Sequence, residues 1–184
     1  RIKIFISATF EAPLLTSQKV KYGVIIHDLT ALFYSGSDFL LERIYLNLYL
    51  QKCLRKSSYI FVPSNSTALI VNKKYPDIRL EKFDVISEGF EHEVFHCPTE
   101  EEKSIVKKIY GLPNKYFLYS GSLLRHKNLI IVLKAMQSIK LSHPDCQLLI
   151  IGPASKIEQR RMEITTDNLG VSENVRIMGY LPRN

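Results

Sequence analysis

Short apolar runs alternate along the chain with longer segments in which apolar and polar residues recur at helical spacing. The runs are mostly apolar throughout, rather than at every second residue, which is typical of parallel strands covered by helices on both faces. Small or polar residues follow the runs, where a strand would give way to a loop. We therefore expect strands at residues 3–6, 22–26, 59–62, 83–86, 116–119, 147–151 and 175–178.

The intervening segments predict helices at residues 40–56, 67–74, 128–141 and 156–169. Strands that alternate with helices indicate an α/β fold built on parallel, doubly wound sheets. In the first helix we expect one face to carry the apolar residues Leu41, Ile44, Tyr45, Leu48 and Leu54.

A break near His96-Cys97-Pro98 divides the alternation into two parts. Residues 99–110 then predict an exposed helix, because Thr99 and Glu102 have the spacing of a capping box. Glycine and proline past its last turn would end it. We therefore expect two Rossmann-like units, at residues 1–97 and 114–184, joined by a linker helix and hinge at 98–113.

The net charge of +7 and the pI near 9.3 fit an anionic partner, such as a nucleotide, a lipid surface or a nucleic acid. A solvated basic surface without a partner fits equally well. No recognised nucleic-acid module is present, and the aromatic residues lie in the expected strands rather than among the lysines, so we expect no nucleic-acid partner.

Three widely spaced cysteines, Cys53, Cys97 and Cys146, fit neither a disulfide framework nor a zinc site. We interpret them as reduced thiols of a cytoplasmic protein. No apolar run approaches the roughly 18 residues that a membrane-spanning helix needs. The chain begins on an expected strand and ends just after one, so we expect it to be a segment of a longer protein.

The stretch YFLYSGSLLRHKNL (residues 116–129) contains the strongest candidate for ligand binding. An apolar strand leads into Gly121 and Ser122, and a loop with Arg125, His126 and Lys127 precedes a helix. Glycine allows a sharp turn and a close approach of a ligand, while the helix N-terminus and the basic side chains attract phosphate. Ligands of parallel sheets bind beyond the carboxyl ends of the strands, where His27, Asp28 and Gly152 are also expected.

The ordered series VIIHDL, YIFVPSNST, VISEGFE, IYGLPNKYFLYSGSLLRHKNL, LLIIGP and VRIMGYLP resembles glycosyltransferase family 4, over residues 22–182. The resemblance implies a retaining, metal-independent enzyme of the GT-B fold, with both Rossmann-like units incomplete here. It places the acceptor in the first unit and the donor in the second. The donor would be a nucleotide-diphosphate sugar such as a GDP- or UDP-hexose, with no separate cofactor, and the acceptor a glycan or a lipid-linked sugar of cell-surface polysaccharide or glycolipid synthesis.

By this resemblance His27 is a catalytic residue near the transferred sugar, although it could simply cap a strand end together with Asp28. Lys127 would hold the donor diphosphate and stabilise the departing nucleotide, and its alternative is a solvated lysine at a helix start. Arg125 could reach the same phosphate from a neighbouring position, because this chain has Ser122 and His126 where the family often has arginine.

Gly121 and Ser122 could offer backbone N–H groups to the diphosphate, and Gly152, Met178 and Gly179 match loops near the nucleotide base. All of these could equally be ordinary turns after strands. Glu88 departs from the family pattern and receives no role, and Ser64 is expected to cap the helix that follows.

Two parts of the family pattern lie outside this sequence: a glycine-rich loop before residue 1, and two glutamates separated by seven residues beyond Asn184. We therefore expect little or no turnover from this segment alone. The alternative function is a non-catalytic nucleotide-sugar-binding module or a truncated inactive relative. The basic and apolar helix at 40–56 could also rest on the inner face of an anionic membrane, but a core-facing helix with a solvated basic side is the preferred interpretation.

Overall fold

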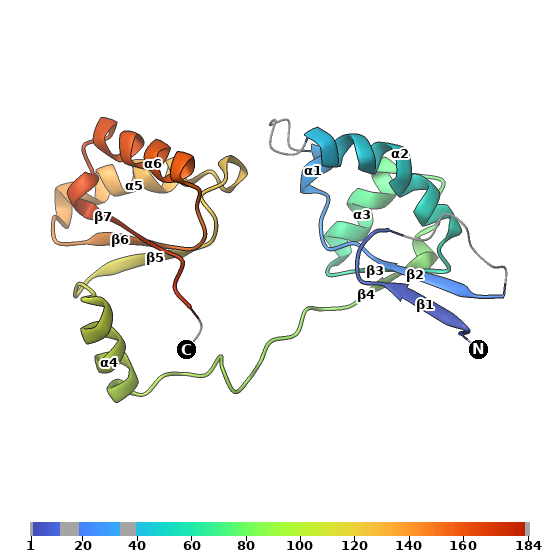
Figure 1. Ribbon diagram of the computed structural model, residues 1–184, viewed down its shortest axis with the longest axis horizontal. Helices are drawn as coiled ribbons and strands as arrows, with labels where there is room; N and C mark the ends of the chain where they lie inside the picture. The colour runs from blue at the N-terminus through green and yellow to red at the C-terminus, as the bar shows by residue number, and fades with distance from the viewer. Residues whose placement is uncertain (1, 12–18, 34–39, 183–184) are drawn as a thin grey trace. The chain divides into compact units, whose positions relative to one another are not determined.

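The computed structural model describes residues 2–11, 19–33 and 40–182, and its chain separates into two compact units at Phe95/His96 (Figure 1). The first unit comprises residues 1–95 and the second residues 96–184. Each has its own buried apolar cluster and its own parallel sheet. The predicted α/β class with parallel sheets in two units is therefore confirmed.

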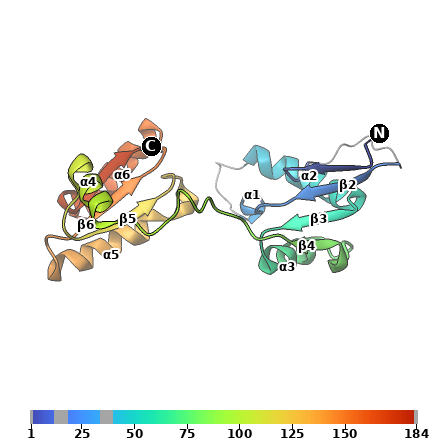
Figure 2. The same cartoon turned by 90° about the horizontal axis from the view of Figure 1, so that it is seen from below.

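The first unit is built on a four-stranded parallel sheet in the order β1-β2-β3-β4. Its strands are β1 (Ile4–Ser7), β2 (Lys21–Ile25), β3 (Tyr59–Val62) and β4 (Phe83–Val85), the last preceded by the 3₁₀ turn η2 (Leu80–Lys82). In Figures 1 and 2 its helices lie over one face of this sheet: α1 (Thr30–Phe33), α2 (Leu40–Lys56) and α3 (Asn65–Lys74).

The expectation that helices cover both faces is wrong for the described part of this unit. Ile60 and Val62 are buried against the helices, whereas Ile4 and Ile6 are 53% exposed on the opposite face. Gly23 of β2 lies between Ile6 and Phe61 on that face, since a Cβ there would lie 3.4 Å and 3.1 Å from these side chains. The outward positions are themselves apolar or aromatic, so the strands have a continuous apolar pattern with only one face covered.

Helix α2 packs on the core by a different face from the expected one. Leu46, Leu50, Cys53 and Leu54 are buried, whereas the other four residues of the predicted face are exposed: Leu41, Ile44, Tyr45 and Leu48. The helix is apolar on two opposite sides, and apolar spacing alone does not say which side meets a sheet.

The second unit has a three-stranded parallel sheet in the order β5-β6-β7. The strands are β5 (Tyr116–Ser120), β6 (Gln147–Ile151) and β7 (Val175–Gly179), with short 3₁₀ turns η3 (Arg125–Lys127) and η4 (Ser172–Asn174) between elements. Helices α5 (Leu129–Ser142) and α6 (Lys156–Asn168) cover one face, where Leu133, Met136, Leu148 and Ile150 form the core. Because the three strands are parallel, the loops that follow them all lie at the carboxyl edge of the sheet.

Helix α4 (Glu100–Tyr110) opens the second unit, on the side of the sheet away from α5 and α6 (Figure 1). The predicted capping box is present: the Thr99 hydroxyl accepts from the Glu102 N–H at 3.2 Å, and the Glu102 carboxylate accepts from the Thr99 N–H at 2.7 Å. Gly111 ends the helix in the left-handed region, at φ 57°. Its carbonyl accepts a hydrogen bond from Arg176 of β7 at 3.0 Å, which fixes the end of α4 to the sheet.

Candidate functional site

Three glycines from separate strand ends meet at the carboxyl edge of the second sheet. The Gly121 N–H donates to the Ile151 carbonyl at 2.9 Å, and the Gly152 N–H donates to the Gly179 carbonyl at 2.8 Å. A Cβ on Gly152 would lie 2.2 Å from the Gly121 carbonyl oxygen, and the φ of Gly152 is 139°. Backbone therefore packs on backbone here, and the edge presents peptide groups that a ligand can approach closely.

The loop that follows β5 is held at both of its ends. The Tyr119 hydroxyl donates to the Ser122 carbonyl at 3.0 Å, and burial raises the pKa of this phenol, so it remains a donor at neutral pH. Leu123 is buried in the core of the unit. Asn128, at φ 51°, turns the chain into α5 without capping that helix by its side chain. Lys127 is thus carried, exposed, on a positioned loop beside a helix N-terminus.

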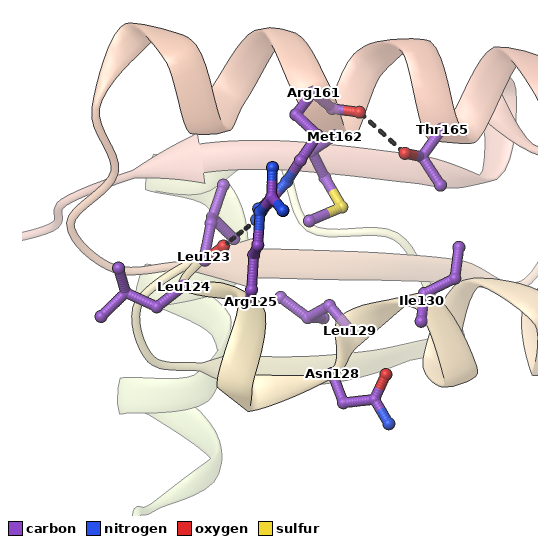
Figure 3. A pocket seen from close by; sticks show the side chains of 9 residues that line it. All are labelled: Leu123, Leu124, Arg125, Asn128, Leu129, Ile130, Arg161, Met162 and Thr165. Carbon is purple, nitrogen blue, oxygen red and sulfur yellow. Dashed lines mark hydrogen bonds between the residues drawn. The ribbon is translucent and has the colours of Figure 1, made fainter. Parts of the chain in front are cut away.

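Arg125 lines a pocket that the other residues predicted to bind the diphosphate do not line. It lines a pocket of about 250 Å³ between the β5–α5 loop and α6 (Figure 3), and Lys127 is not part of that lining. Gly121 and Ser122 stay at the strand end. The sequence pattern could not separate these residues, because spacing along a short turn does not fix the direction of each side chain.

The residues predicted near a nucleotide base lie next to this glycine cluster. A register irregularity after Ile150 pairs Ile151 with Gly179, so that Met178 lies at the irregular position and is half-buried. Gly152 and Gly179 contact each other through the hydrogen bond described above. The second unit therefore gathers Gly121, Gly152, Met178 and Gly179 at one edge.

In the first unit, His27 lies just beyond the end of β2. Its Nε2 is 3.1 Å from the Ala8 carbonyl oxygen, which can only accept, so this nitrogen carries a proton. Its Nδ1 is 4.0 Å from Oε1 of Glu88, and the two side chains are 61% and 75% exposed. Glu88, which received no role from the sequence, is therefore the carboxylate that faces His27, and an Nδ1 proton would be attracted to it.

Two other polar residues at strand ends have structural roles. The Asp28 carboxylate accepts from the Thr30 N–H at 2.8 Å, which is an Asx-type turn that leads into α1. The Ser64 hydroxyl accepts from the Thr67 N–H at 3.2 Å, which confirms the predicted cap of α3. Asp28 is thus accounted for independently of His27, whose imidazole contacts other groups.

Two general properties of the described residues bear on what the site can hold. In the ranges 2–11, 19–33 and 40–182, no three His, Cys, Asp or Glu side chains gather closely enough to hold a metal ion. Within the same ranges no helix has the length and apolarity needed to cross a bilayer.

Comparison with known families gives one match, which covers the second unit. Residues 95–184 match the model described as "Glycosyl transferases group 1". No match was found among the curated proteins. The matched region holds α4, the glycine cluster and Lys127, whereas His27 and Glu88 lie outside it.

Several solved structures share the fold of the chain. Anabaena Alr3699/HepE, crystallised with UDP and glucose, aligns with a TM-score of 0.71 at 17% identity over 89% of this chain and 42% of that one. A Rickettsia africae glycosyltransferase aligns with a TM-score of 0.63 at 19% identity, over 89% and 41% of the two chains.

WaaG, a glycosyltransferase involved in lipopolysaccharide biosynthesis, aligns with a TM-score of 0.67 at 15% identity, over 96% of this chain and 48% of that one. The chain thus spans less than half the length of these proteins. At these identities the comparison establishes the architecture: two α/β units with parallel sheets, as in the GT-B glycosyltransferases.

Proposed function

We propose that this chain is part of a retaining glycosyltransferase of family 4, which moves a hexose from a nucleotide-diphosphate sugar to a glycan or lipid-linked acceptor. This glycosyltransferase would act in the synthesis of cell-surface polysaccharide or glycolipid. The observation that carries the proposal is the glycine-lined carboxyl edge of the second unit, with Lys127 on the loop that leaves this edge after β5, inside the region that matches the glycosyltransferase group 1 model.

In this proposal the second unit binds the donor. The peptide groups around Gly121 and Ser122, the N-terminus of α5 and the ammonium of Lys127 would face the diphosphate. When the bond between the sugar and the diphosphate breaks, negative charge builds up on the leaving phosphate, and a fixed cation stabilises it. The proposal includes no metal ion and no cofactor apart from the nucleotide sugar itself.

The first unit would contribute His27 to the transferred sugar. With its Nε2–H held by Ala8 and its Nδ1 facing Glu88, the ring has a defined orientation from which Nδ1 can accept a hydrogen bond from a sugar hydroxyl. Support for a nucleotide-sugar donor comes from HepE, whose structures contain UDP and UDP-glucose. Support for a lipid-linked acceptor comes from WaaG, which acts in lipopolysaccharide biosynthesis.

The donor assignment is tested on the complete protein by calorimetric titration with UDP. Lys127→Ala should weaken UDP binding by about tenfold or more, because a hydrogen bond to a charged group contributes about 1.5–3 kcal/mol. Lys134→Ala is the matched control, since Lys134 is an exposed lysine of α5 away from the loop. Equal UDP affinity in both variants would contradict the role of Lys127.

A non-catalytic nucleotide-sugar-binding module remains the competing function. Both functions predict nucleotide binding, so the discriminating measurement is the release of UDP from UDP-hexoses and of GDP from GDP-hexoses by the complete protein, with and without acceptor glycolipids. Transfer should occur with at least one donor, and His27→Ala should lower turnover while UDP affinity is retained. Binding without turnover for every donor tested would favour the module.

A further inference from the structure

The pocket beneath the β5–α5 loop is lined by nine residues from that loop, the first turn of α5 and α6, and none of these nine is acidic. Arg125 extends from the turn η3 toward α6, and Arg161 extends from α6 toward the loop (Figure 3). The apolar side chains of Leu129, Ile130 and Met162 line the rest of the same space. Two fixed cations thus share a volume of about 250 Å³.

The contacts of the two guanidinium groups leave most of their hydrogen-bonding capacity unused. Arg161 donates one hydrogen bond to the Leu123 carbonyl, which holds the loop against α6. In the described part of the chain, neither guanidinium forms an ion pair. Glu158, one turn before Arg161, accepts from the Ser155 N–H at 2.7 Å as part of the α6 cap, and the charge of Arg161 adds a smaller contribution to the lowering of the Glu158 pKa. An arginine side chain has five donors, so both can still bind an oxyanion.

Two arginines that face one small pocket with no acidic residue in its lining repel each other, and an anion between them offsets that repulsion. A phosphate group fits this need, because its oxygens accept pairs of parallel N–H bonds from guanidinium forks. The volume of about 250 Å³ is below the usual range of small-molecule sites, which favours a ligand smaller than a nucleotide sugar. The apolar wall is suited to the carbon part of a small phosphorylated molecule.

We propose that Arg125 and Arg161 form a phosphate-binding pocket that is separate from the donor site and takes a small phosphate monoester or inorganic phosphate. Lys127 and the three glycines of the carboxyl edge are not among the residues that line it. The pocket and the donor site share the β5–α5 loop, but each has its own cations. This assignment does not depend on the proposed transferase activity.

The test is a calorimetric titration of the complete protein with inorganic phosphate, in the absence and in the presence of saturating UDP. Arg125→Ala and Arg161→Lys should each weaken phosphate binding by about tenfold, because each removes charge-assisted hydrogen bonds. Arg161→Lys keeps a cation and a donor for the Leu123 carbonyl, so that folding is preserved. Arg160→Ala, a neighbour on α6 that pairs with Glu163, is the matched control and should leave phosphate binding unchanged.

The outcomes separate this pocket from the donor site. Saturating UDP should leave the phosphate affinity within about twofold, and Lys127→Ala should weaken UDP binding without weakening phosphate binding. Competition between UDP and phosphate, or a tenfold loss of UDP affinity in Arg125→Ala, would place Arg125 in the donor site and overturn the proposal. Absence of binding at inorganic phosphate concentrations of order 10⁻² M would overturn the proposal as well.

Discussion

Gly152 shows how a single position can decide whether the carboxyl edge forms. Its φ of 139° and the 2.2 Å between a Cβ built there and the Gly121 carbonyl oxygen leave no room for a side chain. Gly152→Ala should therefore destabilise the protein by at least about 2 kcal/mol, through backbone strain and the forced separation of two strand ends. The change is measured by thermal or urea unfolding of the complete protein.

Gly89→Ala is the matched control for this residue, because nothing lies within 4 Å of a Cβ at Gly89. Removing that glycine should leave stability unchanged or raise it by about 0.4–1 kcal/mol, by reducing the entropy of the unfolded chain. Equal stability of the two alanine variants would show that the three strand ends do not pack as closely as described.

Local residue roles were predictable from sequence where the partner is near in the chain. Ser64 and Thr99 cap the helices that follow them, as expected, because the donor and the acceptor are three residues apart. Arg125 was grouped with Lys127, but its pocket is completed by Arg161, which lies on another helix. The contact of His27 with Glu88 likewise joins two loops, one after β2 and one after β4. Nothing in the sequence marks such pairs, since they depend on how the elements pack.

At the scale of elements, α4 depends on its capping box. Thr99→Ala removes the oxygen that accepts from the Glu102 N–H, and it should cost about 1 kcal/mol of local stability. Ser104→Ala, in the exposed middle of α4, is the control and should leave the helix unchanged or slightly more stable, because alanine has the higher helix propensity. Native-state hydrogen exchange of the α4 amides in the complete protein measures both, and equal protection in the two variants would contradict the cap.

The same cap sets a pH dependence for α4. Hydrogen bonds from the Thr99 N–H and hydroxyl lower the pKa of Glu102, so the folded helix favours the ionised carboxylate. The resulting stability is fully present above the ordinary glutamate range and is lost as pH falls through the lowered pKa. Protection of the α4 amides should accordingly decline on acidification, and Glu102→Gln should remove that decline.

Helix α2 marks the limit of prediction at this scale. Its existence and length follow from the sequence, and its observed bounds agree with the expected ones. Its buried face does not follow, because Leu41, Ile44 and Leu48 have helical spacing as good as that of Leu46, Leu50 and Leu54. The strands of the first unit have the same ambiguity, with apolar residues on both the covered and the exposed face.

The exposed side of α2 gives the membrane hypothesis a defined surface. Leu41, Ile44 and Leu48 are 83%, 50% and 59% exposed, and Lys52 follows on the same side one turn later. If this face rests on an anionic bilayer, burial of apolar side chains and attraction of lysine would act together there. Leu41→Ser with Leu48→Ser should lower the fraction of the complete protein that sediments with phosphatidylglycerol-containing vesicles several-fold.

The control for this surface is Leu69→Ser on α3, which changes another exposed leucine, 60% accessible, in the same unit. Vesicle binding of that variant should equal that of the unaltered protein. Binding that is independent of Leu41 and Leu48, or equally strong to neutral vesicles at high salt, would remove α2 as a membrane contact.

At the scale of the whole molecule, each unit has its own buried core. In the proposed function the second unit binds the donor, and the first unit contributes His27. If the second unit holds the donor, UDP alone should slow hydrogen exchange of the complete protein around residues 121–129, 152–155 and 178–182, where the loops of its carboxyl edge lie. Peptides from the four strands of the first unit should exchange at unchanged rates, since each unit has its own buried core. UDP protection centred on the loop around His27, with none near Lys127, would mean that the nucleotide binds the first unit and that the donor assignment is reversed.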